Sequence, residues 1–145
     1  MIILDTNVIS ELMKVAPNEL VIDWLDAQGA ESVWTTSVCV FEISFGIQRL
    51  PEGKRKRALR SAFDAVLEDD LQRHVLDFDL AAAEAAGLIS AHLESVGRPV
   101  EIRDVQIAGI VAARRATLAT GNTKHFRDTS IATVNPWEFE PSYVF

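Results

Sequence analysis

Five short apolar runs along the chain have the length and the flanking residues expected of buried β-strands. They comprise residues 1–5, 32–36, 74–78, 117–120 and 131–134. The stretches between most of them repeat apolar residues every three or four positions, which predicts helices. Because parallel strands need crossover connections, this alternation predicts an α/β fold with a mostly parallel central sheet flanked by helices.

The pattern also predicts where the helices begin and end. Pro17 favours the start of a helix, Ser37 is expected to cap the helix that carries Glu42, and Gly97-Arg98-Pro99 should end a long one. The predicted helices are 6–15, 17–27, one from 37, one after a turn at 50–53, one from 79, and 104–115.

Three acids interrupt apolar surroundings. Asp5 ends the first strand, Glu42 lies inside the apolar run 38–47, and Asp104 precedes another apolar run. A carboxylate in such a place needs hydrogen-bond donors, a cation or a proton. Asp5 and Asp104 could simply cap helices, and Glu42 could form a core ion pair. If all three meet about 4 Å apart, they repel by about 4 kcal/mol per pair at an effective dielectric of about 20, which favours a bound divalent cation.

These acids are expected to converge, because ligands of parallel sheets bind beyond the carboxyl ends of the strands. Asp5 follows the first strand and Asn122 follows the strand that ends at Thr120. Magnesium prefers oxygen ligands and keeps several waters, so a few carboxylates suffice. The histidines have no zinc-like spacing, although His125, beside Lys124, could contact a phosphate.

Length and composition favour a single domain spanning residues 1–145, with 48% hydrophobic residues. Cys39 is the only cysteine, which excludes an intramolecular disulfide and suggests a reducing compartment. Neither a signal peptide nor a membrane span is expected, because Asp5 interrupts the first apolar run. These features together predict a cytoplasmic protein.

The formal net charge of −7 argues against a surface that binds nucleic acid everywhere. Six of the fourteen basic residues nevertheless lie within residues 49–60. This run is either part of a local phosphate-binding face or an ordinary solvated helix surface.

The order of these motifs resembles PIN domains, and more narrowly the VapC and FitB-type toxins of bacterial toxin–antitoxin pairs. The resemblance covers almost the whole chain and is carried by residues 3–11, 41–46, 104–108, 119–126 and 135–137. It implies a ribonuclease that depends on magnesium or manganese, with Asp5, Glu42 and Asp104 at the family's acidic positions. It also implies an RNA substrate, a homodimer, and an antitoxin whose C-terminal segment occupies the active-site groove.

One position departs from the family pattern. Asn122 stands where a fourth acid is common, so it is expected to contribute a neutral oxygen to the metal site. Four further residues are expected to support the acids or the substrate, namely Thr6, Asn7, Arg103 and Thr120. For Thr6 and Asn7, a simple role at the start of a helix is the alternative.

The sequence is also compatible with two other functions. The first is a PIN-like module that binds RNA or protein with weakened or lost catalysis, for which Asn122 is the clue. The second is a magnesium-binding domain of the receiver or phosphoaspartyl phosphatase kind. It is less favoured because the residue two positions after Asp5 is Asn7 rather than a second acid.

Overall fold

The computed structural model of the protein describes residues 1–141, so the last four residues of the predicted domain lie outside the described part. Within it, the strands are β1 Ile2–Leu4, β2 Val33–Thr36, β3 Val75–Leu76, β4 Thr117–Ala119 and β5 Ala132–Val134. They form one sheet in the order β3-β2-β1-β4-β5, and every neighbouring pair is parallel. The predicted α/β fold with a central parallel sheet is confirmed.

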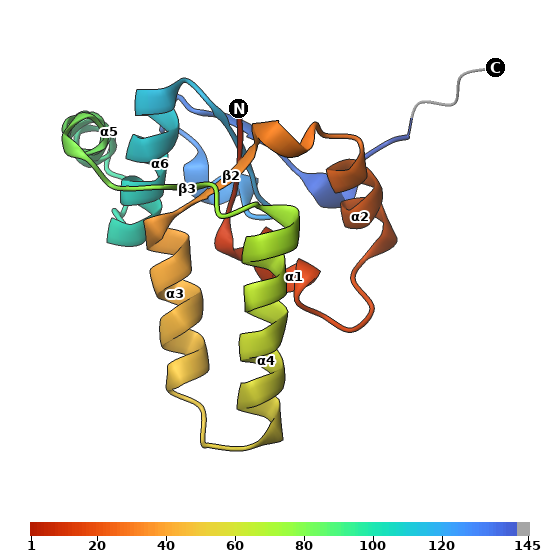
Figure 1. The fold of residues 1–145 in the computed structure, drawn as a ribbon. Helices are drawn as coiled ribbons and strands as arrows, with labels where there is room; N and C mark the ends of the chain where they lie inside the picture. The colour runs from red at the N-terminus through yellow and green to blue at the C-terminus, as the bar shows by residue number, and fades with distance from the viewer. Residues whose placement is uncertain (142–145) are drawn as a thin grey trace.

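Helices surround this sheet and include a long hairpin (Figure 1). In Figure 1, α3 and α4 run side by side and extend away from the sheet, joined by a turn at the far end. Helices α5 and α6 pack together at another side of the molecule. The bounds are α1 Thr6–Leu12, α2 Glu19–Asp26, α3 Ser37–Gln48, α4 Lys54–Ala65, α5 Leu80–Ser95 and α6 Ile102–Arg114.

The cap predicted for the helix that carries Glu42 and the start predicted for the helix that carries Asp104 are wrong. Thr36, not Ser37, caps α3, because the Thr36 hydroxyl accepts a hydrogen bond from the backbone N–H of Cys39. Helix α6 begins at Ile102, and Glu101 caps it by accepting from the backbone N–H of Asp104. Asp104 therefore lies in the first turn of α6 rather than at its cap.

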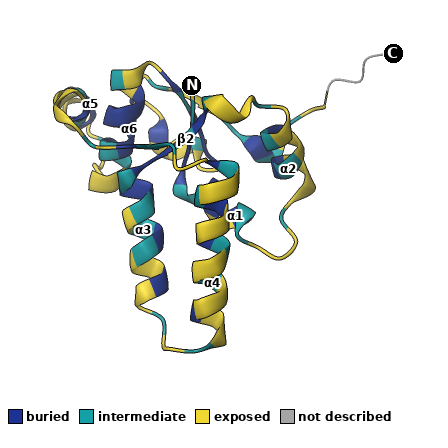
Figure 2. Cartoon of the chain, viewed as in Figure 1, coloured by how far each residue is buried: buried dark blue, intermediate teal, exposed yellow. Residues whose placement is uncertain are grey.

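The core lies between the sheet and the helices. Ile3 and Leu4 on the central strand β1 and Leu118 on its neighbour β4 are fully buried, and the buried residues follow the inner faces of the helices (Figure 2). Helices α5 and α6 approach closely at Gly109, where an added Cβ would lie 2.5 Å from the backbone oxygen of Ala82. Such a distance is too short for any side chain, so the contact requires glycine.

Among residues 1–141, no helix has both the length and the apolar character needed to cross a membrane. Burial raises the pKa of the Cys39 thiol to about 11, so this cysteine stays protonated and unreactive at neutral pH.

Candidate active site

Asp5 is held at the carboxyl end of the central strand β1 by three donors. One carboxylate oxygen accepts from the backbone N–H of Thr6 at 2.8 Å, which caps α1. The other accepts from the Thr120 hydroxyl at 2.8 Å and from the Asn7 side-chain amide at 3.1 Å. Asn7 in turn accepts from the backbone N–H of Gly121 at 2.9 Å. These bonds join the ends of β1 and β4 and fix the orientation of the Asp5 carboxylate.

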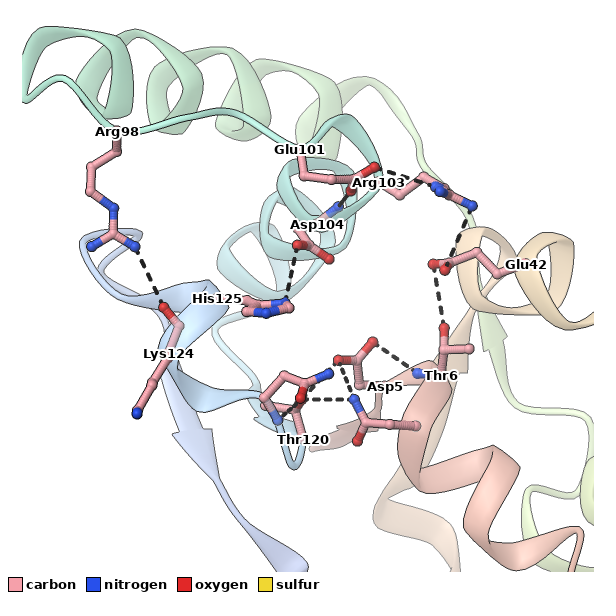
Figure 3. A network of polar contacts seen from close by, with 12 residues as sticks. Asp5, Thr6, Glu42, Arg98, Glu101, Arg103, Asp104, Thr120, Lys124 and His125 are labelled. Carbon is pink, nitrogen blue, oxygen red and sulfur yellow. Dashed lines mark hydrogen bonds and ion pairs between the residues drawn. The ribbon is translucent and has the colours of Figure 1, made fainter.

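Glu42 projects from the middle of α3 toward the same end of the sheet. One of its carboxylate oxygens accepts from the Thr6 hydroxyl at 3.3 Å. The other lies 3.9 Å from the guanidinium of Arg103, a loose ion pair. Figure 3 shows Glu42 between Thr6 and Arg103, facing the region where Asp5 and Asp104 lie. The contact with Arg103 fits the alternative of an ion pair, although this pair is not in the core.

Asp104 comes from the first turn of α6, on the opposite wall. Its carboxylate lies 3.7 Å from Nδ1 of His125, which belongs to the short 3₁₀ helix η3 (Thr123–Phe126) after β4. Glu101, the cap of α6, contacts both the Asp104 backbone and the Arg103 side chain. Asp104 is thus placed by a helix start and faces an imidazole (Figure 3).

These side chains line one open cavity of about 370 Å³. Asn122 lies on its wall, and its backbone N–H donates to the Thr120 hydroxyl at 3.0 Å. Thr120 does not line the cavity because it is fully buried beneath Asp5. The lining residues are Asp5, Thr6, Asn7, Glu42, Glu101, Arg103, Asp104, Asn122 and His125.

Burial raises the pKa of each of the three predicted acids from its ordinary value. For Asp5 the hydrogen bonds from Thr120, Thr6 and Asn7 oppose burial without cancelling it. The charge of Asp5 further raises the pKa of Glu42 and Asp104, while Arg103 lowers both. The three acids therefore repel one another across the cavity, and a cation between them would lower all three pKa values.

The acids share a cavity but do not form a compact cluster. Within residues 1–141, no three His, Cys, Asp or Glu side chains lie close enough together to enclose a metal ion. The full repulsion expected for carboxylates about 4 Å apart is therefore absent from this arrangement. The donor set nevertheless fits magnesium, which is typically held by one or two carboxylates and several waters rather than by a cage of protein ligands.

Two residues of the cavity were not assigned a role in the acidic site from the sequence. Glu101 was missed because the predicted helix began at Asp104, two residues later than α6 does. Its signal is present in the sequence, since Glu101 precedes Asp104 by three residues, the spacing of a helix cap and its partner. His125 was considered only as a phosphate contact, and its position beside Asp104 follows from how η3 packs.

The basic run of residues 49–60 does not reach this cavity. Lys56 is buried and binds Glu52 at 2.6 Å and the backbone oxygen of Gln48 at 3.1 Å, so it fastens α4 to the end of α3. Its neighbours Lys54 and Arg55 begin α4 at the far end of the hairpin (Figure 1). Arg103 does line the cavity, and its guanidinium lies 3.9 Å from Glu42.

Comparison with known proteins agrees with this architecture. The model of the PIN domain family matches residues 2–132. VapC ribonuclease Y4jK of Sinorhizobium fredii is 35% identical over 138 residues, which cover 95% of this chain and 99% of that protein. Toxin FitB of Neisseria gonorrhoeae is 33% identical over 137 residues, which cover 94% and 99%.

A solved structure of FitAB bound to an IR36 DNA fragment has the same fold. The superposition has a TM-score of 0.86 at 32% identity and covers 99% of this chain and all of the matched one. The chain therefore belongs to the PIN domain family, and the resemblance to its VapC and FitB-type members is confirmed.

Proposed function

We propose that this protein is an endoribonuclease that uses magnesium or manganese to hydrolyse RNA phosphodiester bonds, as the toxin of a type II toxin–antitoxin pair. One observation carries the proposal. Asp5, Glu42 and Asp104 come from separate segments, line one cavity, and repel one another there. The names of two relatives, a VapC ribonuclease and toxin FitB, support the reaction and the biological role.

Asp5, Glu42 and Asp104 would hold the cation, with the amide oxygen of Asn122 as a neutral fourth ligand. When bound, a divalent metal activates water and neutralises the charge that develops on the phosphate oxygens. This chemistry requires oxygen ligands and no histidine or cysteine ligand. A neutral group at position 122 should hold the metal more weakly than a carboxylate would.

The surrounding residues orient the acids. Thr120 and Asn7 fix one oxygen of Asp5, while the backbone N–H of Thr6 fixes the other. These hydrogen bonds hold the Asp5 side chain in one rotamer, with its carboxylate facing the cavity. Arg103 has a half-exposed guanidinium close to Glu42, so it can move from that carboxylate to a substrate phosphate.

An antitoxin partner is part of the proposal. A groove of about 290 Å³ adjoins the acidic cavity on the side of Glu42, because Thr6 and Glu42 line both. It runs between α1, α3 and α4, with apolar walls that include Ile43 and Leu59 and an open position at Gly46. An antitoxin's C-terminal segment lying here would reach the acids and block them.

We also propose a homodimer of single-domain chains, each spanning residues 1–145, that acts in the cytoplasm. Exposed apolar side chains support self-association, since Leu80 and Leu88 on α5 are each 76% exposed. Phe41 and Phe45 stack on the outer face of α3 and are also more than half exposed. Light scattering of the purified chain would measure the dimer.

The alternative is a PIN-like module that binds RNA or protein and has lost most of its activity. The neutral Asn122 and the separation of the three acids favour this binding module over a receiver-like or phosphatase-like domain, which no contact in the site supports. The two functions differ in turnover. A binding module retains RNA and returns it uncut at any metal concentration, whereas a nuclease cuts it.

The test combines metal removal with Asp5→Asn. Labelled single-stranded RNA is incubated with the protein in chelator, then with magnesium or manganese restored. Cleavage is expected only with metal, and Asp5→Asn should lose it while keeping a cooperative unfolding transition. Asp23→Asn on α2, an exposed position outside the cavity, is the matched control and should cut normally. Cleavage that persists in chelator, or in Asp5→Asn, would contradict the proposal.

A further inference from the structure

The open space beside the acids continues beyond the acidic cavity. A second cavity of about 290 Å³ adjoins the acidic one on the side of His125, because Glu101, Asp104 and His125 line both. Figure 3 shows this boundary, with Asp104 and His125 facing each other and Arg98 and Lys124 beyond them. A strand of RNA whose phosphate lies at the acids would extend directly into this second cavity.

The floor of the second cavity is apolar and built from different elements. Leu93 of α5 and Val105 of α6 are each only 5% exposed, and Pro99 lies in the loop between these helices. Thr129 is also buried there, but its hydroxyl already donates to the backbone oxygen of Phe126. This floor offers packing surface and little hydrogen bonding, which suits the flat face of an aromatic ring.

The rim of the cavity carries two basic side chains, Arg98 and Lys124, and the acids Glu101 and Asp104 line its boundary with the acidic cavity. The guanidinium of Arg98 lies 3.0 Å from a carboxylate oxygen of Asp128 and also contacts the backbone oxygen of Lys124 at 3.5 Å. Arg98 has five N–H donors, so several remain for a ligand after these two contacts. Asp128 offsets the charge of Arg98, so the free N–H donors of Arg98 and the ammonium of Lys124, rather than an overall positive charge, are what this rim offers to RNA.

The size of the cavity limits what it can hold. Pockets for drug-sized molecules measure roughly 300–1,000 Å³, so a cavity of about 290 Å³ fits a smaller group. Single-stranded RNA presents unstacked bases, which proteins recognise by packing on their faces and by hydrogen bonds from Arg to their edges. A single nucleobase therefore matches the floor, the rim and the volume.

We propose that this cavity, the Arg98 pocket, binds the base of the nucleotide next to the cleaved bond and makes cleavage selective for sequence. Its lining residues are Leu93, Arg98, Pro99, Val105, Lys124 and Thr129, with the three shared residues at the boundary. The inference rests on the proposed ribonuclease function. Arg98 acts in it as a specificity residue, and it takes no part in bond cleavage.

The test removes the base from the RNA instead of altering the protein. A pool of single-stranded 12-nucleotide RNAs with a randomised centre identifies a rapidly cut sequence in magnesium or manganese. That RNA is then made with one abasic residue at each position in turn. Loss of the base in the pocket should lower kcat/KM by about tenfold, since base packing contributes about 1–3 kcal/mol. The other abasic positions should have smaller effects.

Protein variants then connect that base to Arg98. Arg98→Gln should lower kcat/KM several-fold on intact RNA and have little effect on the RNA that lacks the same base. Asp128→Asn is the matched control, because it removes the same ion pair and keeps the guanidinium. Asp128 has a φ of 67°, which asparagine also tolerates, so this change should leave activity within about twofold of wild type.

The outcomes separate the inference from the function on which it rests. If wild type cuts RNA but every abasic position behaves alike, the Arg98 pocket holds no base, and a peptide side chain becomes the better occupant. If Asp128→Asn reproduces the loss seen in Arg98→Gln, Arg98 only supports its loop. If wild type cuts no RNA with either metal, the proposed function fails and the inference fails with it.

Discussion

The buried hydroxyl of Thr120 makes three hydrogen bonds in the candidate site. Its removal tests whether these bonds orient Asp5 and stabilise the protein. The hydroxyl donates to Asp5 at 2.8 Å and accepts from the Asn7 amide at 3.1 Å and from the Asn122 N–H at 3.0 Å. Thr120 is 0% exposed, so water cannot easily replace it. Thr120→Val keeps the shape of the side chain and removes all three hydrogen bonds. Thr120→Ser keeps the hydroxyl and removes one methyl group.

The magnitude follows from these contacts. A hydrogen bond to a charged group contributes about 1.5–3 kcal/mol and a neutral one about 1 kcal/mol, so three lost bonds cost about 4 kcal/mol. The extra methyl of valine recovers about 1 kcal/mol by burial, leaving a net loss of about 3 kcal/mol. At roughly 3 °C per kcal/mol for a chain of this size, Tm should fall by about 10 °C. Thr120→Ser should lose about 1 kcal/mol for its missing methyl.

Urea unfolding of the metal-free variants measures this difference directly. A loss in Thr120→Val about three times that in Thr120→Ser is expected. Equal losses would show that the hydroxyl network contributes nothing to stability, and the account of how Asp5 is positioned would then be wrong.

The same substitution should change the pH dependence of cleavage. The Thr120 hydrogen bond lowers the pKa of Asp5, against the larger effect of burial, so its removal raises that pKa further. A higher pKa means that Asp5 becomes protonated at a higher pH. The acid limb of the activity profile should therefore move to higher pH in Thr120→Val and stay in place in Thr120→Ser, as measured by cleavage rates between pH 5 and 8.

Three further predictions concern separate parts of the molecule. Gly109→Ala should destabilise the protein by about 1–3 kcal/mol because its Cβ meets the α5 backbone, whereas Gly87→Ala, with open space around it, should be neutral or stabilising by denaturant unfolding. Lys56→Gln should lower Tm by several degrees, while Lys54→Gln, at an exposed position, should change neither Tm nor RNA affinity. Asn122→Asp should reduce the manganese concentration needed for half-maximal cleavage and lower stability without metal; identical titration curves would place residue 122 outside the metal site.

The general fold could be predicted from the sequence because its signals are local. Short apolar runs alternate with helical patterns, and this alternation alone requires parallel strands with crossovers. The placement of Asp5 and Asn122 at one edge of the sheet follows from the same topology, since both follow strands. What could not be predicted is which other strand ends lie beside β1. The observed order places β4 next to β1, and this brings Thr120 beneath Asp5.

The wall opposite Asp5 was harder to predict, because the roles of Glu101 and Asp104 depend on the residue at which α6 begins. A start of α6 at Asp104 would make this residue a helix cap and leave Glu101 in a loop. The actual start at Ile102 makes Glu101 the cap, so the Asp104 side chain has no capping role and faces the cavity instead. At Asp5 the opposite holds, because one carboxylate caps α1 and also lines the cavity. Capping and site chemistry are therefore not exclusive alternatives. A capping carboxylate uses one oxygen to accept a hydrogen bond from the helix. At Asp5 the other oxygen accepts from Thr120 and Asn7, and these two donors determine how many of its lone pairs are left to bind a ligand.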